Sequence, residues 1–335
     1  MTGAATPLIE LRGVSKRFAK SLDLAEKIAR KLGAKVREEV VHAVAAVDLV
    51  IRPGEVVGLV GESGCGKSTL GRIVAGIMVP SAGSILYRGR DRAALPPPER
   101  KAAQLAVQMI FQDPYASLNP RMRVRDIVGE APAVHGIVAR ADLAAYVDQL
   151  LRRVGLDPSY VRRYPHQFSG GQRARIGIAR ALAVKPEFIV CDEAVAALDV
   201  SIQAQVLNLF AELREAFGLT YLFISHDLGV VEHLSDRVAI MYLGRIVEEA
   251  PTEELFAAPN HPYTQALLAE VPRLDERRKN FAALKGEIPS PLDPPPGCHF
   301  HPRCPHAMAR CREEAPVLRD IAPGHRAACH LNDRI

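Results

Sequence analysis

One short stretch constrains the fold of this chain more than any other. Residues 56–60 (VVGLV) form an apolar run typical of a buried strand, and a glycine-rich segment follows directly. Gly61, Gly64 and Gly66 lack a Cβ atom, so the backbone N–H groups around them can curve toward an anion. The helix that we expect to begin near Lys67 points its positive end at the same place. The stretch therefore predicts a strand–loop–helix unit that binds phosphate.

The spacing of this loop, from Gly61 to Lys67-Ser68, is that of a Walker A motif. Lys67 supplies a positive charge for the outer phosphates of a nucleotide, and the Ser68 hydroxyl suits Mg²⁺. A glycine-rich turn without a ligand is the alternative, and the flanking strand and helix argue against it. Phe18, earlier in the chain, is a candidate platform for an adenine ring, although a lone aromatic residue is also common in a core. The loop residues that we predict to bind nucleotide are Gly61, Glu62, Ser63, Gly64, Cys65, Gly66, Lys67, Ser68 and Thr69.

Composition bounds the class of protein. The 335 residues can bury a substantial core, and the 48% hydrophobic and 24% charged content is ordinary for a globular protein. The net charge of +5 permits contact with nucleic acid or an anionic membrane face but argues for neither. No apolar run approaches the roughly 20 residues that span a bilayer, and residues 1–7 lack the pattern of a signal peptide. We therefore expect a cytosolic protein whose six cysteines are reduced or bound to metal.

Three further apolar runs end in polar side chains. Residues 107–112 finish at Gln112, residues 188–191 lead into Asp192-Glu193, and residues 221–225 lead into His226. In open α/β sheets ligands bind outside the carboxyl ends of the strands. Asp192 suits Mg²⁺, Glu193 suits the activation of water, and a histidine can hydrogen-bond a terminal phosphate. A helix-capping acidic pair is the alternative for the two carboxylates, and the Walker A loop argues against it.

The rest of the chain supplies expectations about its elements. Residues 8–12 alternate like an edge strand, residues 88–100 read as a surface connection, and Phe168-Ser-Gly-Gly-Gln172 opens a helix with a second anion site at its start. The basic insertion 19–41 is either a solvated excursion or a contact with lipid or a partner. We also expect strands at 44–51 and 84–87, helices within 123–164 and 202–217, and a hairpin of 238–242 and 245–248.

With these residues assembled, the chain resembles the ATP-binding cassette (ABC) ATPases along nearly its whole length. The family's motifs occur in order: the Walker A loop, the Q-loop glutamine Gln112, the Walker B strand 188–193, and the switch histidine His226. The resemblance further implies a D-loop ending at Asp199 and a signature motif that contacts ATP bound to a second subunit, formed by Ser169, Gly170, Gly171 and Gln172. It implies an α/β P-loop NTPase fold with a RecA-like core, an antiparallel β subdomain and a helical subdomain at about 114–184.

Within the family, the chain is most similar to the ATPase subunits of oligopeptide and dipeptide importers. This narrower match rests on residues 111–121, 200–206 and 297–306. It implies a nucleotide-binding domain over 1–256, a small cysteine-rich extension over 257–335, and a peripheral place on the cytoplasmic face of the membrane. The implied partners are a second ATPase, identical or paralogous, two transmembrane permeases and, indirectly, an extracytoplasmic solute-binding protein, with no nucleic acid.

The resemblance also implies a role for each motif. Lys67 would bind the outer phosphates, Ser68, Gln112 and Asp192 would serve Mg²⁺, and Glu193 would be the catalytic base, with Gln112 and His226 beside it. Two positions depart from the family pattern, because Ala194 replaces the usual proline and Ala196 the usual D-loop serine. Uptake of nickel or another small solute is the closer alternative function. A non-transport ABC protein that acts on nucleic acid or ribosomes is the remote one.

The tail gathers four cysteines in a segment with little apolar content. Four thiols in a short cytosolic segment indicate one metal centre that acts as a structural staple. Zinc sites typically use closely spaced cysteine pairs, whereas successive cysteines here are five residues or more apart. That spacing and the resemblance favour a [4Fe–4S] cluster, while the nearby histidines keep zinc open and a redox sensor is a third reading. The predicted ligands are Cys298, Cys304, Cys311 and Cys329.

Overall fold

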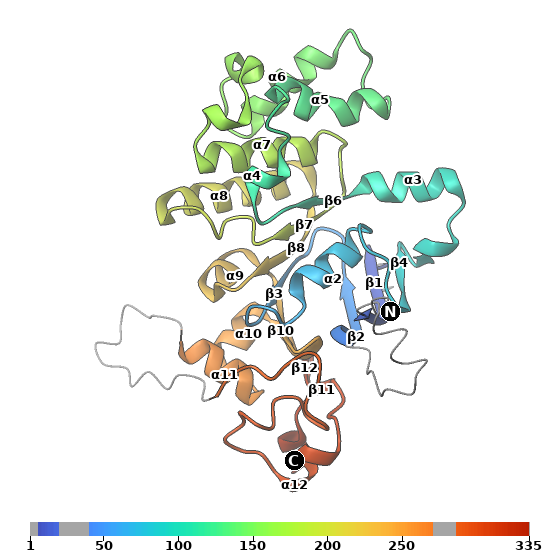
Figure 1. Cartoon of the computed structure of the whole chain (residues 1–335), viewed down its shortest axis with the longest axis vertical. Coiled ribbons are helices and arrows are strands. Elements are labelled where there is room, and N and C mark those ends of the chain that lie inside the picture. Colours follow the sequence, from blue (N-terminus) through green and yellow to red (C-terminus); the bar gives the residue numbers. More distant parts are fainter. Residues whose placement is uncertain (1–5, 20–39, 271–285, 335) are drawn as a thin grey trace, which may run out of the picture.

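A mixed eight-stranded sheet forms the centre of the molecule (Figure 1). The computed structural model describes residues 6–19, 40–270 and 286–334. The strands lie in the order β11-β12-β10-β9-β3-β8-β7-β6. Their bounds are β3 Val56–Val60, β6 Val107–Ile110, β7 Phe188–Asp192, β8 Thr220–Ser225, β9 Arg237–Tyr242, β10 Arg245–Pro251, β11 Arg319–Ala322 and β12 His325–Ala327.

Parallel pairing dominates the middle of this sheet. β3 pairs in parallel with β8 and β9, and β7 pairs in parallel with β8 and β6. Strands β3, β7 and β8 are buried along their whole length, which explains their continuous apolar sequences. Because parallel strands end at the same edge, the loops after β3, β6, β7 and β8 are brought together.

A smaller antiparallel sheet packs beside the central one. Its order is β2-β1-β4-β5, with bounds β1 Ile9–Ala19, β2 Val40–Ile51, β4 Ala82–Tyr87 and β5 Arg90–Asp91. The predicted edge position of residues 8–12 is wrong, because β1 pairs with β2 on one side and β4 on the other. Alternation reports that one face of a strand is solvated, and it says nothing about whether the backbone edges are paired.

Helices cover the sheet and build one end of the molecule. In Figure 1, α4 to α7 lie beyond the β6 edge of the sheet, and α12 lies at the opposite end. Helix α3 occupies part of the predicted surface connection, since Pro97 and Pro98 stand in its first turn, where proline is tolerated. The helices are α2 Lys67–Val74, α3 Pro97–Ala106, α4 Pro114–Ser117, α5 Val124–Val134, α6 Leu143–Arg153, α7 Gly170–Leu182, α8 Val200–Phe217, α9 Leu228–Leu234, α10 Thr252–Ala257, α11 Pro262–Ala269 and α12 Ala309–Glu313. The described residues also contain four 3₁₀ turns: η1 Arg92–Ala94, η2 Pro158–Arg162, η3 Pro165–Gln167 and η4 His330–Arg334.

The cysteine-rich extension continues the central sheet. Strand β12 pairs with β10, and β11 pairs with β12. Phe300 is 1% exposed, and its ring lies against those of Tyr242, Tyr263 and His261 at centroid separations of 5.3 Å, 5.4 Å and 5.7 Å. Cys298 and Cys304 are packed against the same apolar cluster. The extension, short of apolar residues on its own, therefore shares a core with strands β9 and β10, to which its helix α11 also contributes.

Two further predictions concern membrane-spanning segments and the basic insertion at 19–41. Within the described ranges, no helix is both long enough and apolar enough to cross a bilayer. The basic insertion predicted at 19–41 lies almost wholly outside the described residues, since only residue 19 and residues 40–41 are included. Its two alternative readings stay as they were.

A buried histidine, His261, lies between helix α11 and strand β10 of the sheet. His261 is 1% exposed and caps α11, because its Nδ1 accepts a hydrogen bond from the Tyr263 N–H at 3.1 Å. Its own backbone N–H donates to the Glu248 carboxylate at 2.9 Å. Burial lowers the pKa of His261 to about 4. The neutral ring is therefore the form that the fold accommodates.

We predict that His261→Asn makes the stability of the protein less dependent on pH. On acidification the unfolded chain, with an ordinary histidine pKa of about 6.5, binds a proton before the folded chain does, so stability falls as the pH drops from about 6.5 toward 4. Urea unfolding at about pH 7 and about pH 5 should show roughly 2 kcal/mol more loss in the wild type than in the asparagine variant, which keeps a helix cap. Equal losses in the two proteins would contradict the prediction.

Candidate functional site: the Walker A edge of the sheet

The loop between β3 and α2 is held in a tight curve by close backbone contacts. Gly66 has φ +108°, and a Cβ there would lie 2.1 Å from the Ala43 carbonyl oxygen. A Cβ on Gly61 would lie 2.1 Å from the Met241 carbonyl oxygen. Lys67 is 4% exposed, and its Nζ donates to the carbonyl oxygens of Gly61 at 2.6 Å and Glu62 at 2.9 Å. The lysine ammonium therefore lies inside the curve of the loop, where phosphate oxygens would meet it.

The end of β7 brings the predicted magnesium ligands together. The Ser68 hydroxyl donates to Asp192 Oδ1 at 2.8 Å, across 124 positions of sequence. Asp192 is 1% exposed, and burial raises the pKa of its carboxyl group, while the Ser68 hydrogen bond acts in the opposite direction. A hydroxyl and a carboxylate side by side are oxygen ligands of the kind Mg²⁺ prefers. The donor set at this position fits that ion.

Three strand ends converge on Glu193. Its Oε2 accepts a hydrogen bond from Gln112 Nε2 at 2.6 Å and lies 3.5 Å from His226 Nδ1. Glu193 itself has φ +47°, in the left-handed region that is costly for a residue with a side chain. The parallel pairing of β6, β7 and β8 explains the meeting of the three residues. A carboxylate held between an amide and an imidazole is arranged to orient a water molecule.

The signature residues lie at the start of α7. The Ser169 hydroxyl accepts from the Gln172 N–H at 3.4 Å, and the Gln172 side chain accepts from the Ser169 N–H at 3.1 Å, which forms a capping box. A Cβ on Gly171 would lie 2.4 Å from Ile202 Cγ2. Among the hydrogen bonds of the described chain, none from residues 169–172 reaches the Walker A loop. Within one chain the signature residues are thus separate from the Walker A loop, and the second anion site stays a prediction.

The remaining predicted nucleotide residues lie at the margins. Phe18, on β1, is 40% exposed, and the Lys16 ammonium stands 5.3 Å from its ring centroid. Its exposed face fits a stacking platform better than a core position. Asp199 is exposed at the start of α8 and follows the exposed Ala196. Among the hydrogen bonds of the described residues, none joins Phe18 or Asp199 to Glu193, whereas the Ala196 N–H donates to the Glu193 carbonyl oxygen at 3.1 Å.

The four tail cysteines are all reduced and share one neighbourhood. The Cys298 N–H donates to the Cys311 carbonyl oxygen at 2.8 Å. Burial raises the pKa of Cys298 to about 11, and the nearby thiols of Cys311, Cys329 and Cys304 add to the rise. In the part of the chain that is described, no three His, Cys, Asp or Glu side chains are arranged to hold one metal ion. The structure thus gathers the four cysteines without supporting either an iron–sulfur cluster or zinc by itself.

Two residues that the sequence analysis missed hold the Walker A loop from outside. The Arg303 guanidinium donates to both carboxylate oxygens of Glu62, at 2.7 Å and 3.0 Å. The Tyr263 hydroxyl accepts from the Glu62 N–H at 2.9 Å. Arg303 lies between two predicted metal ligands, and no pattern in the sequence connects that segment with a loop 241 positions earlier.

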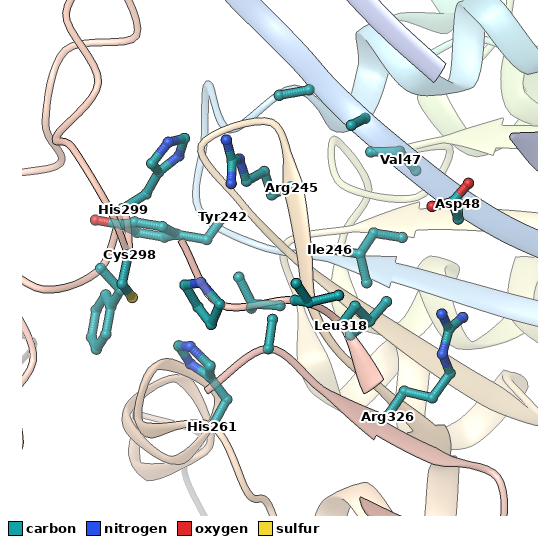
Figure 2. Close-up of a pocket in the computed structure, with 18 residues that line it drawn as sticks. Val47, Asp48, Tyr242, Arg245, Ile246, His261, Cys298, His299, Leu318 and Arg326 are labelled. Carbon is teal, nitrogen blue, oxygen red and sulfur yellow. The ribbon is translucent and has the colours of Figure 1, made fainter. Parts of the chain in front are cut away.

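A cavity of about 240 Å³ lies elsewhere, between β2, the β9–β10 hairpin and the extension. Figure 2 shows Arg245, Arg326 and His261 around it, with Cys298 at its margin. Cys298 is the one predicted site residue that lines it, and no residue of the Walker A loop does. This cavity is therefore not the nucleotide site.

Comparison of the sequence with known proteins assigns the chain to a family. A sequence profile for ABC transporters matches residues 44–196, and one for the C-terminal region of oligopeptide/dipeptide transporters matches residues 247–311. The oligopeptide transport ATP-binding protein AppF of Bacillus subtilis is 51% identical to this chain over 97% of each sequence. The chain belongs to the ATP-binding proteins of the oligopeptide and dipeptide ABC transporter family. It is an ABC ATPase, as its sequence motifs had indicated.

Other relatives agree with this assignment. A putative peptide import ATP-binding protein of Brucella ovis is 47% identical over 98% of this chain and 99% of its own length. Among solved structures, a dimeric ATP-binding cassette in a post-hydrolysis state with ADP and Pi aligns with TM-score 0.61 and 26% identity, over 73% of this chain and 98% of that one. The cbiO1 subunit from Clostridium perfringens aligns with TM-score 0.61 and 25% identity, over 76% of this chain and 92% of that one. The predicted ABC cassette fold is thus confirmed, and membership in the family implies cassette dimerisation within a transporter complex.

The Glu193 geometry generates a prediction for this ABC ATPase. Glu193→Gln should bind ATP normally but lose turnover by about 10²-fold or more, because the amide cannot accept the proton that the carboxylate accepts. Steady-state phosphate release and nucleotide binding measured on the same preparation separate the two effects. Glu232→Gln on α9, an exposed position, is the control and should keep wild-type turnover. Wild-type turnover in the Glu193 variant would remove the assignment.

Proposed function

We propose that this ATPase powers the uptake of short peptides across a membrane. The observation that carries the proposal is the relationship to AppF across nearly the whole chain, together with the match of residues 247–311 to the oligopeptide/dipeptide C-terminal region. The ATPase itself does not bind the transported solute, so the assignment depends on these relationships rather than on a solute pocket.

The residues of the Walker A edge divide the chemistry of ATP hydrolysis. Lys67 binds the outer phosphates, and Ser68, Asp192 and Gln112 would hold Mg²⁺, which when bound offsets the phosphate charge. Glu193 orients the attacking water and accepts its proton, and Gln112 keeps the carboxylate in place at 2.6 Å. His226, close to the same carboxylate, donates to the terminal phosphate. The contacts among these side chains support this division of roles.

A complete site requires a second ATPase subunit, identical or paralogous. Ser169, Gly170 and Gly171 of one subunit would cap ATP held on the Walker A loop of the other, which explains why they stand apart from that loop in one chain. ATP then joins the two subunits, and hydrolysis releases them. Two permeases at the membrane would follow this opening and closing, with a solute-binding protein acting on the outer side and this chain at the inner face.

The chain divides, in this proposal, into a nucleotide-binding domain over 1–256, with its helical subdomain at about 114–184, and an extension over 257–335. The bounds of α5 to α7 support the helical subdomain. Because β12 pairs with β10, the extension adds strands to the sheet of the nucleotide-binding domain and does not form a separate unit.

Growth of a deletion strain tests the peptide assignment. A strain without this gene should fail to grow on a di- or oligopeptide as the sole source of a required amino acid, and the wild-type gene should restore growth. The Lys67→Ala gene is the matched control and should not restore it, since the phosphate-binding charge is absent. Unchanged peptide uptake with lost nickel uptake would replace peptides by the alternative solute.

We also propose that Cys298, Cys304, Cys311 and Cys329 hold a [4Fe–4S] cluster. Four reduced cysteines in one neighbourhood match the ligand set of such a cluster, and their wide sequence spacing lets each approach from a separate loop. Zinc is the competing metal ion, because four thiolates are also a common structural zinc set. The cluster would strengthen a segment that otherwise depends on Phe300 and its neighbours.

Anaerobic purification distinguishes these possibilities. The full-length protein should be brown, with broad absorbance near about 400 nm and bound iron, and Cys304→Ser should lose both. Cys65→Ala changes a cysteine outside the extension and should keep the colour. Colourless protein with one equivalent of zinc would replace the cluster by zinc, and metal-free protein would remove the site.

A further inference from the structure

The contact between Arg303 and Glu62 joins the extension to the nucleotide loop. The guanidinium meets the carboxylate through two hydrogen bonds, the geometry that gives arginine–carboxylate pairs their strength and direction. The Arg303 side chain is 4% exposed and that of Glu62 is 22% exposed. A pair so shielded is screened little by salt and holds its geometry better than an ordinary surface pair.

Glu62 uses each of its polar groups in holding the Walker A loop. Its carboxylate meets Arg303, its N–H donates to the Tyr263 hydroxyl, and its carbonyl oxygen accepts from Lys67 Nζ at 2.9 Å. Two of these three contacts come from residues C-terminal to 256. The extension thus fixes Glu62, the residue that follows the first glycine of the loop. The peptide groups around Glu62 set the direction of the phosphate-binding N–H groups.

The position of Arg303 depends in turn on the fold of residues 298–304, the segment between the first two cysteines of the extension. Its backbone N–H donates to the Phe300 carbonyl oxygen at 3.0 Å, and the His301 N–H donates to the Cys298 carbonyl oxygen at 3.0 Å. The guanidinium carbon stands 5.9 Å from the Tyr242 ring centroid. Tight turns between Cys298 and Cys304 therefore aim the arginine at the Walker A loop.

We propose that Arg303 is a positioning residue of the nucleotide site. It fixes Glu62, and through Glu62 the shape of the Walker A loop, so that the fold of the cysteine-rich extension sets the affinity of the protein for ATP. The proposal rests on the ATP-binding role of the loop and on neither peptide transport nor a bound cluster. It assigns to the extension a part in nucleotide binding in addition to its place in the core.

Nucleotide binding by the full-length protein tests the role of Arg303. Arg303→Ala should raise the Kd for a fluorescent ATP analogue with Mg²⁺ by about tenfold, equivalent to about 1.4 kcal/mol. Arg303→Lys should fall between, because an ammonium keeps the charge but not the two-bond fork. In turnover assays the KM for ATP should rise while kcat changes little, since Arg303 does not touch the reacting atoms.

The matched control is Arg310→Ala, in the same extension. Arg310 also makes a two-bond contact with a carboxylate, that of Glu314, at 2.6 Å and 2.9 Å. Neither Arg310 nor Glu314 has a hydrogen bond to the Walker A loop among those of the described residues. The Kd of the Arg310→Ala variant should equal that of the wild type. The increase in the unfolding midpoint that ATP produces should shrink for Arg303→Ala and persist for Arg310→Ala, which separates lost binding from lost fold.

A double-mutant cycle completes the test. Glu62→Gln alone should weaken binding as Arg303→Ala does, and the double variant should be no worse than either, because both changes break one contact. If Arg303→Ala fails to fold, Glu62→Gln decides the question by itself. Affinity within about twofold of the wild type in the folded variants, or fully additive effects, would overturn the proposal. Failure of the peptide growth assay would leave this result unaffected.

Discussion

The parallel pairing of β3, β6, β7 and β8 is the constraint on which the site depends. It places four loops at one edge of the sheet, and each loop contributes one part of the chemistry: the phosphate loop, Gln112, the Asp192-Glu193 pair and His226. A shift of one residue in any of these pairings would move the polar side chain at the strand end by more than a hydrogen-bond length. The 2.6 Å and 2.8 Å contacts of Glu193 and Asp192 therefore depend on the register of buried strands rather than on the loops themselves.

Much of this arrangement was predictable from sequence, because it is encoded by local patterns. Continuous apolar runs identified β3, β7 and β8, and glycines with Lys67 and Ser68 identified the phosphate loop. The strand-end logic then placed Gln112, Glu193 and His226 together, although they are distant in the chain. The features that were predicted correctly are encoded by hydrophobic patterns or by motifs within a short stretch of sequence.

The failures concern properties that no short stretch carries. Residues 8–12 alternate correctly, yet which strands flank β1 is decided by β2 and β4. The proline-rich start of α3 has the composition of a loop, and proline in a first helical turn looks the same in sequence. The link from Arg303 to Glu62 is a long-range pairing between two ordinary charged residues, and its partners become visible only when the extension is placed on the sheet.

The pairing of β12 with β10 has a consequence for how the molecule meets other proteins. Without it, β10 would offer an unpaired row of backbone N–H and C=O groups, which is a template for adding a foreign strand. The extension covers the middle of that row, at Glu248 and Glu249, and moves the end of the sheet outward to β11, a four-residue strand whose Arg319 and Asp320 are exposed. A short, charged terminal strand is a poor template for further pairing. The tail thus leaves this end of the sheet poorly suited to the addition of a foreign strand, while the loops that carry the nucleotide site lie along a different edge.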